Sequence, residues 1–165
     1  MMTIDIYLKS LAWKVLRREF WHDGQKVDIT KTWLYPYVIS MAEHSRGRVM
    51  PRDGIGEGYI SGQLIITDYD YEHTGGHLTE ERMKTLSKMI CDKERDDVCL
   101  RACYLHALTG VGMAPAIESI LIKRGYDDDE LNYQQLKKCY QRHFRQVEKD
   151  IVADYHRIEQ LKKIQ

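Results

Sequence analysis

The stretch that decides the predicted fold is residues 97–151, DVCLRACYLHALTGVGMAPAIESILIKRGYDDDELNYQQLKKCYQRHFRQVEKDI. It predicts three helices in succession. Gly110 and Gly125 follow the first two, as glycine commonly does at a helix C-terminus, and Pro115 suits the first turn of the second. The third helix is predicted from about Leu131 to Leu161 because apolar residues recur there at spacings of three and four. These are Leu136, Tyr140, Phe144, Val147, Ile151, Tyr155 and Ile158.

A short helix, a turn and a long basic helix are typical of a helix-turn-helix, whose second helix lies in the major groove of DNA. Suitable side chains lie off the apolar stripe at the start of the last helix. Asn and Gln pair with adenine edges and Arg with guanine, while Lys and Arg neutralise phosphates. The predicted DNA-binding residues are Asn132, Gln134, Gln135, Lys137, Lys138, Gln141, Arg142 and Arg145. The alternative is an amphipathic helix with a merely solvated polar face.

Two further helices are predicted upstream of this unit. Thr79 suits the N-cap of a helix over 80–92, and two glutamates follow it in the first turn, where the helix dipole favours negative charge. The charged run DKERDD, residues 92–97, predicts a break before the helix over about 97–109. That second helix is apolar most of the way round, so we expect it to be central.

Residues 78–151 resemble the DNA-binding core of sigma factor region 4, and more particularly the Q-type late antitermination proteins of lambdoid phages. The resemblance lies in the acidic helix with Met83, Leu86 and Ile90, in Arg101 and 104–110, and in the helices at 117–121 and 136–151. Residues 4–16, IDIYLKSLAWKVL, also resemble the opening helix of that family. The turn 125–132 is longer and more acidic than in the family, and 45–77 has no counterpart. The resemblance implies binding to double-stranded DNA near a promoter and docking on RNA polymerase, which then reads through terminators.

The N-terminal part is also predicted to be mainly helical. Ile4, Leu8, Leu11 and Val15 fit one stripe of a helix over 3–20, and Pro36 indicates a helix start or turn. Glycines make 45–62 loop-like, and 63–71 has the composition of a strand with only a weak partner near Tyr59. We therefore expect a mainly α fold with a small β or loop insertion. The predicted segments are an N-terminal helical segment 1–44, the insertion 45–77, and the helix-turn-helix domain with its long C-terminal helix 78–165.

Charge is unevenly distributed although the net charge is zero. Residues 1–52 carry nine basic and five acidic side chains, whereas 53–97 carry five and eleven; residues 131–165 carry eight and four. On a strand, Asp68, Asp70 and Glu72 would share one face. We predict that these residues bind a protein partner, and the resemblance implies that this partner is RNA polymerase. In the alternative, the three carboxylates hold a divalent cation in a metal-dependent nuclease.

The cysteines and glycines suggest ligand sites that we do not expect to be used. Cys99, Cys103 and His106 are spaced to share a helix face, but the chain has no C-x-x-C pair and buried cysteines usually pack as small hydrophobes. We therefore predict free thiols and no structural metal. The GIGEG run at 54–58 lacks the Lys-Ser/Thr of a phosphate loop, so we expect a flexible loop and no cofactor.

The N-terminus does not resemble a signal peptide, and the sequence has no run of about 18 apolar residues. We expect a cytoplasmic protein, in the host cytoplasm if phage-encoded, with no membrane partner. The function that we expect is DNA-binding transcription regulation without catalysis. The alternative classes are a helical protein-interaction module and the nuclease. A homodimer through the C-terminal helix is one option for its apolar stripe.

Overall fold

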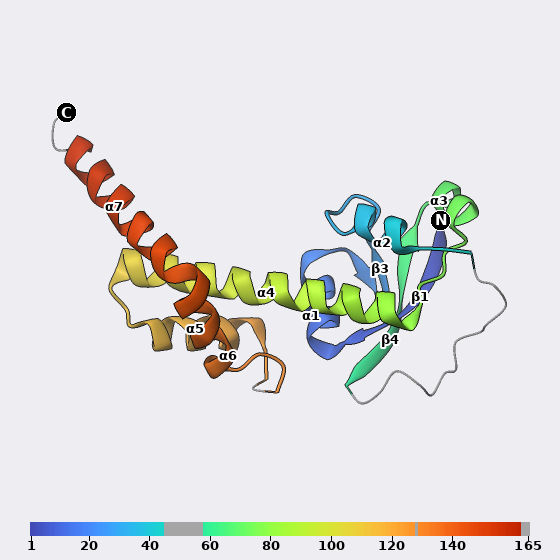
Figure 1. Cartoon of the computed structure of the whole chain (residues 1–165), viewed down its shortest axis with the longest axis horizontal. Coiled ribbons are helices and arrows are strands. Elements are labelled where there is room, and N and C mark those ends of the chain that lie inside the picture. The colour runs from blue at the N-terminus through green and yellow to red at the C-terminus, as the bar shows by residue number, and fades with distance from the viewer. Residues whose placement is uncertain (45–57, 128, 163–165) are drawn as a thin grey trace. The chain divides into compact units, whose positions relative to one another are not determined.

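The computed structural model describes residues 1–44, 58–127 and 129–162. It is mostly helical with one small four-stranded sheet (Figure 1). The chain forms two compact units, Met1–Cys91 and Asp92–Gln165. The prediction of a mainly α protein is confirmed at this level. No helix in the described part of the chain is long and apolar enough to cross a membrane.

Unit 1 is built around the sheet. Its strands have the order β1-β4-β3-β2, with β1 and β4 antiparallel and β4 and β3 parallel. The strands β2 and β3 form a short hairpin around Gly24, whose φ is +58°. The elements are β1 (Met2–Lys9), α1 (Ser10–Glu19), β2 (His22–Asp23), β3 (Lys26–Asp28), α2 (Tyr35–Met41), β4 (Tyr59–Ile66), α3 (Asp68–Thr74) and the first part of α4 (Glu80–Thr109).

The predicted helix over 3–20 is wrong in its first half, where the chain forms strand β1. Ile4, Ile6 and Leu8 are buried and alternate with more exposed residues, which is the period of a strand. The same residues also fit a helical stripe through Leu8, Leu11 and Val15. The pairing of β1 with β4, from Met2 with Ile66 to Lys9 with Tyr59, decides between the two patterns.

The core of unit 1 lies on one face of the sheet. Trp13 of α1 packs there, 2 % exposed, and its ring Nε1–H donates to the Ile60 carbonyl oxygen at 2.6 Å. Early α4 lies along β1: the Ser87 hydroxyl accepts a 2.9 Å hydrogen bond from the Lys9 backbone N–H. This contact satisfies a backbone donor on the outer side of an edge strand, which otherwise faces no partner.

The predicted strand over 63–71 is also wrong in its second half. Strand β4 ends at Ile66, and α3 begins at Asp68. Thr67 caps α3, since its hydroxyl accepts from the Asp70 N–H at 3.1 Å and donates to the Asp70 carboxylate at 2.6 Å. Thr67 and Asp70 thus cap the helix reciprocally, but unlike in a capping box the Asp70 carboxylate binds the Thr67 hydroxyl and not the Thr67 backbone N–H, which donates to the Tyr35 hydroxyl. The predicted loop and GIGEG run fall largely on residues 45–57, which lie outside the described part of the chain.

Unit 2 consists of the rest of α4, then α5 (Met113–Arg124), α6 (Tyr133–Cys139), a π-helical turn η1 (Tyr140–Phe144) and α7 (Arg145–Lys162). The predicted break at 92–97 is wrong, because α4 is one continuous helix. Its charges are paired along the helix, Asp92 with Arg95 and Asp97 with Arg101, each at 2.8 Å. Such i,i+3 and i,i+4 pairs stabilise a helix. Gly110 and Gly125 follow α4 and α5 with positive φ, as predicted.

Candidate nucleic-acid interface

The predicted DNA-binding residues lie at the N-cap of α6, along α6 and the π-turn, and at the first residue of α7. The N–H of Arg145 donates to the carbonyl oxygen of Tyr140, which is the five-residue spacing of a π-helix. The side chains of Gln134, Gln135, Lys137, Lys138, Gln141, Arg142 and Arg145 are exposed. The structure therefore brings seven of the eight residues to the surface of one continuous helical segment.

Asn132 has a different role from the other predicted residues. It is the N-cap of α6, and its side-chain oxygen accepts from the Gln135 N–H at 2.9 Å. A capping side chain of this kind satisfies a backbone donor that the helix leaves without a partner. Asn132 is therefore engaged in starting the helix rather than presented for contact.

The cations of this segment are not neutralised by the protein. The side chains of Lys137, Lys138, Arg142 and Arg145 form no hydrogen bond or ion pair with another residue in the described part of the chain. Between Tyr133 and Lys149 the one carboxylate is that of Glu148. Its side chain is only 13 % exposed and is held by neighbouring side chains. The outer surface of the segment is thus uniformly basic or amide-bearing.

Glu148 links α7 to the end of α4. Its Oε2 accepts from the Tyr140 hydroxyl, and its Oε1 lies 3.1 Å from His106 Nε2. The other ring nitrogen of His106 lies 2.5 Å from the Val111 carbonyl oxygen. Burial and the neighbouring Glu148 carboxylate raise the pKa of Tyr140 to about 12. At neutral pH Tyr140 is therefore a hydrogen-bond donor, and the negative charge of Glu148 is directed inward.

Thiols of α4 support the inner side of the same segment. Cys99 Sγ lies 3.5 Å from the Leu136 carbonyl oxygen, and Cys103 Sγ lies 4.0 Å from that of Phe144. Both thiols belong to side chains with no exposed surface. The prediction that these cysteines pack in the core is confirmed. No cluster of three metal-ligating side chains occurs among the described residues.

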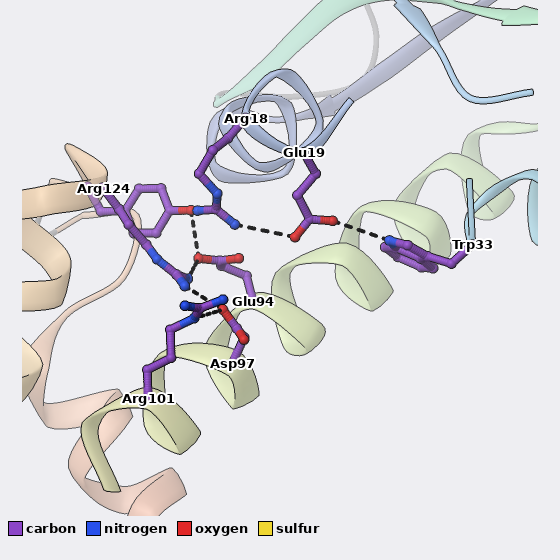
Figure 2. Close-up of polar contacts among 8 residues, drawn as sticks. Arg18, Glu19, Trp33, Glu94, Asp97, Arg101 and Arg124 are labelled. Atoms are coloured by element: carbon purple, nitrogen blue, oxygen red, sulfur yellow. Dashed lines mark hydrogen bonds and ion pairs between the residues drawn. The ribbon is translucent and has the colours of Figure 1, made fainter. Parts of the chain in front are cut away.

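A buried ionic cluster joins α4 to the end of α5 (Figure 2). The Arg124 guanidinium, 9 % exposed, binds the carboxylates of Glu94 and Asp97. Glu94 is 1 % exposed and also accepts from the Tyr126 hydroxyl at 2.7 Å. Burial opposes the ionisation of Asp97, but Arg124 and Arg101 outweigh it and lower the pKa of that carboxyl. The charges of this cluster are paired with one another, in contrast to those of α6.

A hollow of about 630 Å³ lies beside the basic segment within unit 2. Gln135, Lys138 and Arg142 reach it from one side and Asp92, Arg95 and Asp96 of α4 from the other. Gln134, Lys137, Gln141 and Arg145 do not line it. The structure therefore divides the predicted residues into a set that faces the hollow and a set that faces outward.

The acidic residues predicted to bind a partner do not share a strand face, because they lie on α3. Asp70 is engaged within the protein: hydrogen bonds from Thr67 and Tyr35 lower its pKa. Asp68 lies 2.8 Å from the N-terminal ammonium, with both groups largely exposed. Glu72 is exposed. The strand arrangement that suggested a shared metal ion is therefore wrong.

Comparisons with known proteins give no further guide to the class of this chain. No family model matches it, and neither a curated protein nor a solved structure is significantly similar to it. The residues and their arrangement are therefore the basis for assigning a function.

Proposed function

We propose that this protein binds double-stranded DNA through the outer surface of α6, η1 and the start of α7. The observation that carries the proposal is a continuous helical surface whose four predicted cations have no partner in the described part of the chain, with its one carboxylate turned inward. Unpaired Lys and Arg side chains favour a polyanion, because binding releases the counterions condensed on its phosphates. Exposed Gln134 and Gln141 add groups able to pair with base edges.

The order of elements also supports this function. Late α4, α5 and the α6–α7 segment follow one another along the chain in the order of the helices of a helix-turn-helix, although the connection from Arg124 to Tyr133 is longer than the turn of that motif. The buried cluster around Arg124 ties α5 to α4, and Leu136 and Cys139 bury the inner side of α6. In this proposal α5 braces the unit, and α6 is the helix that enters the major groove.

The biological role that we propose is regulation of transcription, by antitermination on RNA polymerase. Its support is the resemblance of residues 78–151 to Q-type antitermination proteins. Unit 1, with exposed Asp68 and Glu72 on α3, is the part proposed to contact the polymerase. A pulldown with RNA polymerase tests this part: Asp68→Ala together with Glu72→Ala is expected to weaken capture, and unchanged capture would remove these residues from the interface.

DNA binding is tested by fluorescence anisotropy with labelled duplex DNA at several salt concentrations. Replacing Lys137, Lys138, Arg142 and Arg145 with Gln is expected to lower affinity. The slope of log affinity against log salt should become shallower by about 0.9 for each phosphate that the variant no longer neutralises. Lys88→Gln, an exposed lysine of unit 1, is the matched control. Equal affinity of the quadruple variant and the wild type at low salt would contradict the proposal.

A second candidate function is a helical protein-interaction module. The observation that favours it is at the other end of α7, where Tyr155 is 41 % and Ile158 52 % exposed. Apolar residues of an amphipathic helix are normally covered by a partner surface. A folded wild-type protein that shows no salt-dependent affinity for duplex DNA would favour this candidate.

A further inference from the structure

The π-turn changes which side chains of the basic segment are aligned. In a regular α-helix each residue advances by about 100°, so over the twelve residues from Lys137 to Lys149 the direction would drift by about 120°. In the five-residue π-turn the hydrogen bonds span one residue more, and each residue advances by only about 82°. The drift between Lys137 and Lys149 thereby falls to about 30°.

The burial of the segment agrees with this four-residue repeat. Leu136 is buried, and Tyr140, Phe144 and Glu148 are half-buried, so every fourth residue lies on the inner side. Tyr140 and Glu148 are also bonded to each other across the π-turn. In an unbroken α-helix, Phe144 would lie about 80° from Leu136, with Glu148 about 120° away and directed outward.

The residues that directly follow Leu136, Tyr140, Phe144 and Glu148 form a second row, and all of their side chains are exposed. This outer row consists of Lys137, Gln141, Arg145 and Lys149. Lys149, like the two other cations of the row, has no hydrogen-bond or ion-pair partner among the residues that the structure describes. Sequence reasoning based on a regular helix assigned no role to Lys149, because the π-turn cannot be seen in the apolar spacing alone.

We propose that the π-turn sets the register of DNA contact, and that Lys149 is a further phosphate-binding residue at the end of the outer row. The inference rests on the proposed DNA binding and extends it. A straight row of this kind covers roughly 18 Å at about 1.5 Å per residue, or slightly less because the π-turn rises less steeply. That length spans several successive phosphates along one strand, which follow one another at about 3.4 Å along the DNA axis. Gln141 is placed between cations in the row, where it faces the same groove.

The test compares the salt dependence of duplex DNA binding between single Gln substitutions. Lys149→Gln is expected to make the log–log slope shallower by about 0.9, and so are Lys137→Gln and Arg145→Gln. Lys88→Gln, outside the row, should leave the slope unchanged. All four positions are exposed, so each variant is expected to fold, and circular dichroism checks this.

The role of the π-turn in setting the register is tested by inserting one Ala after Gln141. The insertion adds about 100° of rotation, so Lys149 turns away from the row and Lys149→Gln should no longer alter the slope. If the insertion variant loses helicity, the comparison of single substitutions decides alone.

The failures of the two proposals are distinguishable. A wild-type protein that binds duplex DNA with a slope insensitive to Lys149→Gln overturns the inference and leaves DNA binding standing. An undiminished effect of Lys149→Gln in a folded insertion variant rejects the role of the π-turn in setting the register. A wild type without measurable affinity for DNA at low salt rejects both.

Discussion

At the scale of single residues, the role of each arginine in unit 2 depends on the carboxylates around it. Arg124 is almost buried and is neutralised by Glu94 and Asp97, so its charge stabilises the link between α4 and α5. Arg142 is exposed and has no such partner in the described residues. The same type of side chain thus links two helices at Arg124 and is available to a ligand at Arg142. The formal charge read from the sequence does not distinguish these two roles.

Acid should weaken the cluster around Asp97. Its pKa is lowered in the folded protein, so ionised Asp97 contributes stability at neutral pH. That contribution is present above the ordinary Asp pKa of 3.8 and is lost as the pH falls from there through the lowered folded value. We expect the free energy of unfolding to fall more steeply with pH below about 4 in the wild type than in Asp97→Asn. Urea titrations across this range measure the difference; parallel curves would contradict the assignment.

The buried thiols should react slowly. Burial, with the charge of Glu148 second, raises the pKa of Cys103 to about 11, and burial, with Cys139 second, raises the pKa of Cys99. Since the thiolate is the reactive form, both are expected to lag behind half-buried Cys91 in a thiol-reagent assay at pH 8. Cys91→Ser should remove the fast phase, while a fast phase that persists in this variant would show that a buried cysteine is accessible.

At the scale of elements, the sequence predicted helices well where local signals decide. The ends of α4 and α5 follow from Gly110 and Gly125, and the α2 start follows from Pro36. The exposure of the basic residues was also predicted, because basic residues beside an apolar stripe are a local pattern. The capping role of Asn132 was not predicted, although an Asn just before a helix is a strongly preferred N-cap.

Elements set by distant partners could not be predicted in this way. Residues 2–9 fit both a helix and a strand, and only their pairing with β4, at least 50 residues away, selects the strand. The continuity of α4 depends on charge pairs along the helix and on Arg124 reaching Glu94 from α5. The start of α3 was the avoidable error, because Thr67 and Asp70 carry the sequence signature of a reciprocal cap.

The contact between α1 and β4 should be intolerant of a side chain at position 62. A Cβ on Gly62 would lie 2.3 Å from the Trp13 ring and 3.0 Å from the Gln25 carbonyl oxygen. We expect Gly62→Ala to lower the free energy of unfolding by about 1–3 kcal/mol, as overpacked cores do. Ser61→Ala, exposed on the same strand, is the control. Chemical denaturation measures both, and equal stability of the two variants would show that the ring moves aside without cost.

At the scale of the whole molecule, the chain separates a mixed α/β unit from an all-helical one. Unit 1 buries Leu8, Leu11 and Val15 in its own core. Basic surface and exposed apolar residues remain at opposite ends of the α6–α7 segment. We propose that the basic surface binds DNA and that the exposed apolar residues bind another copy of the chain.

The last prediction concerns this second copy. Val147, Ile151 and Ile158 follow a heptad in which Asp154 takes one core position, and a polar residue there fixes register at a cost in stability. We expect a weak dimer in sedimentation equilibrium, and truncation after Ala153 should yield a monomer with an unchanged melting temperature. The truncation keeps Val147, Ile151 and the Glu148 contacts, so unit 2 should stay folded. Replacing Asp154 with Leu should tighten the dimer, because apolar side chains then fill every heptad core position from 147 to 158. A wild type that is monomeric at every concentration, or a truncated protein that still dimerises, would contradict dimerisation through the apolar residues at the end of α7.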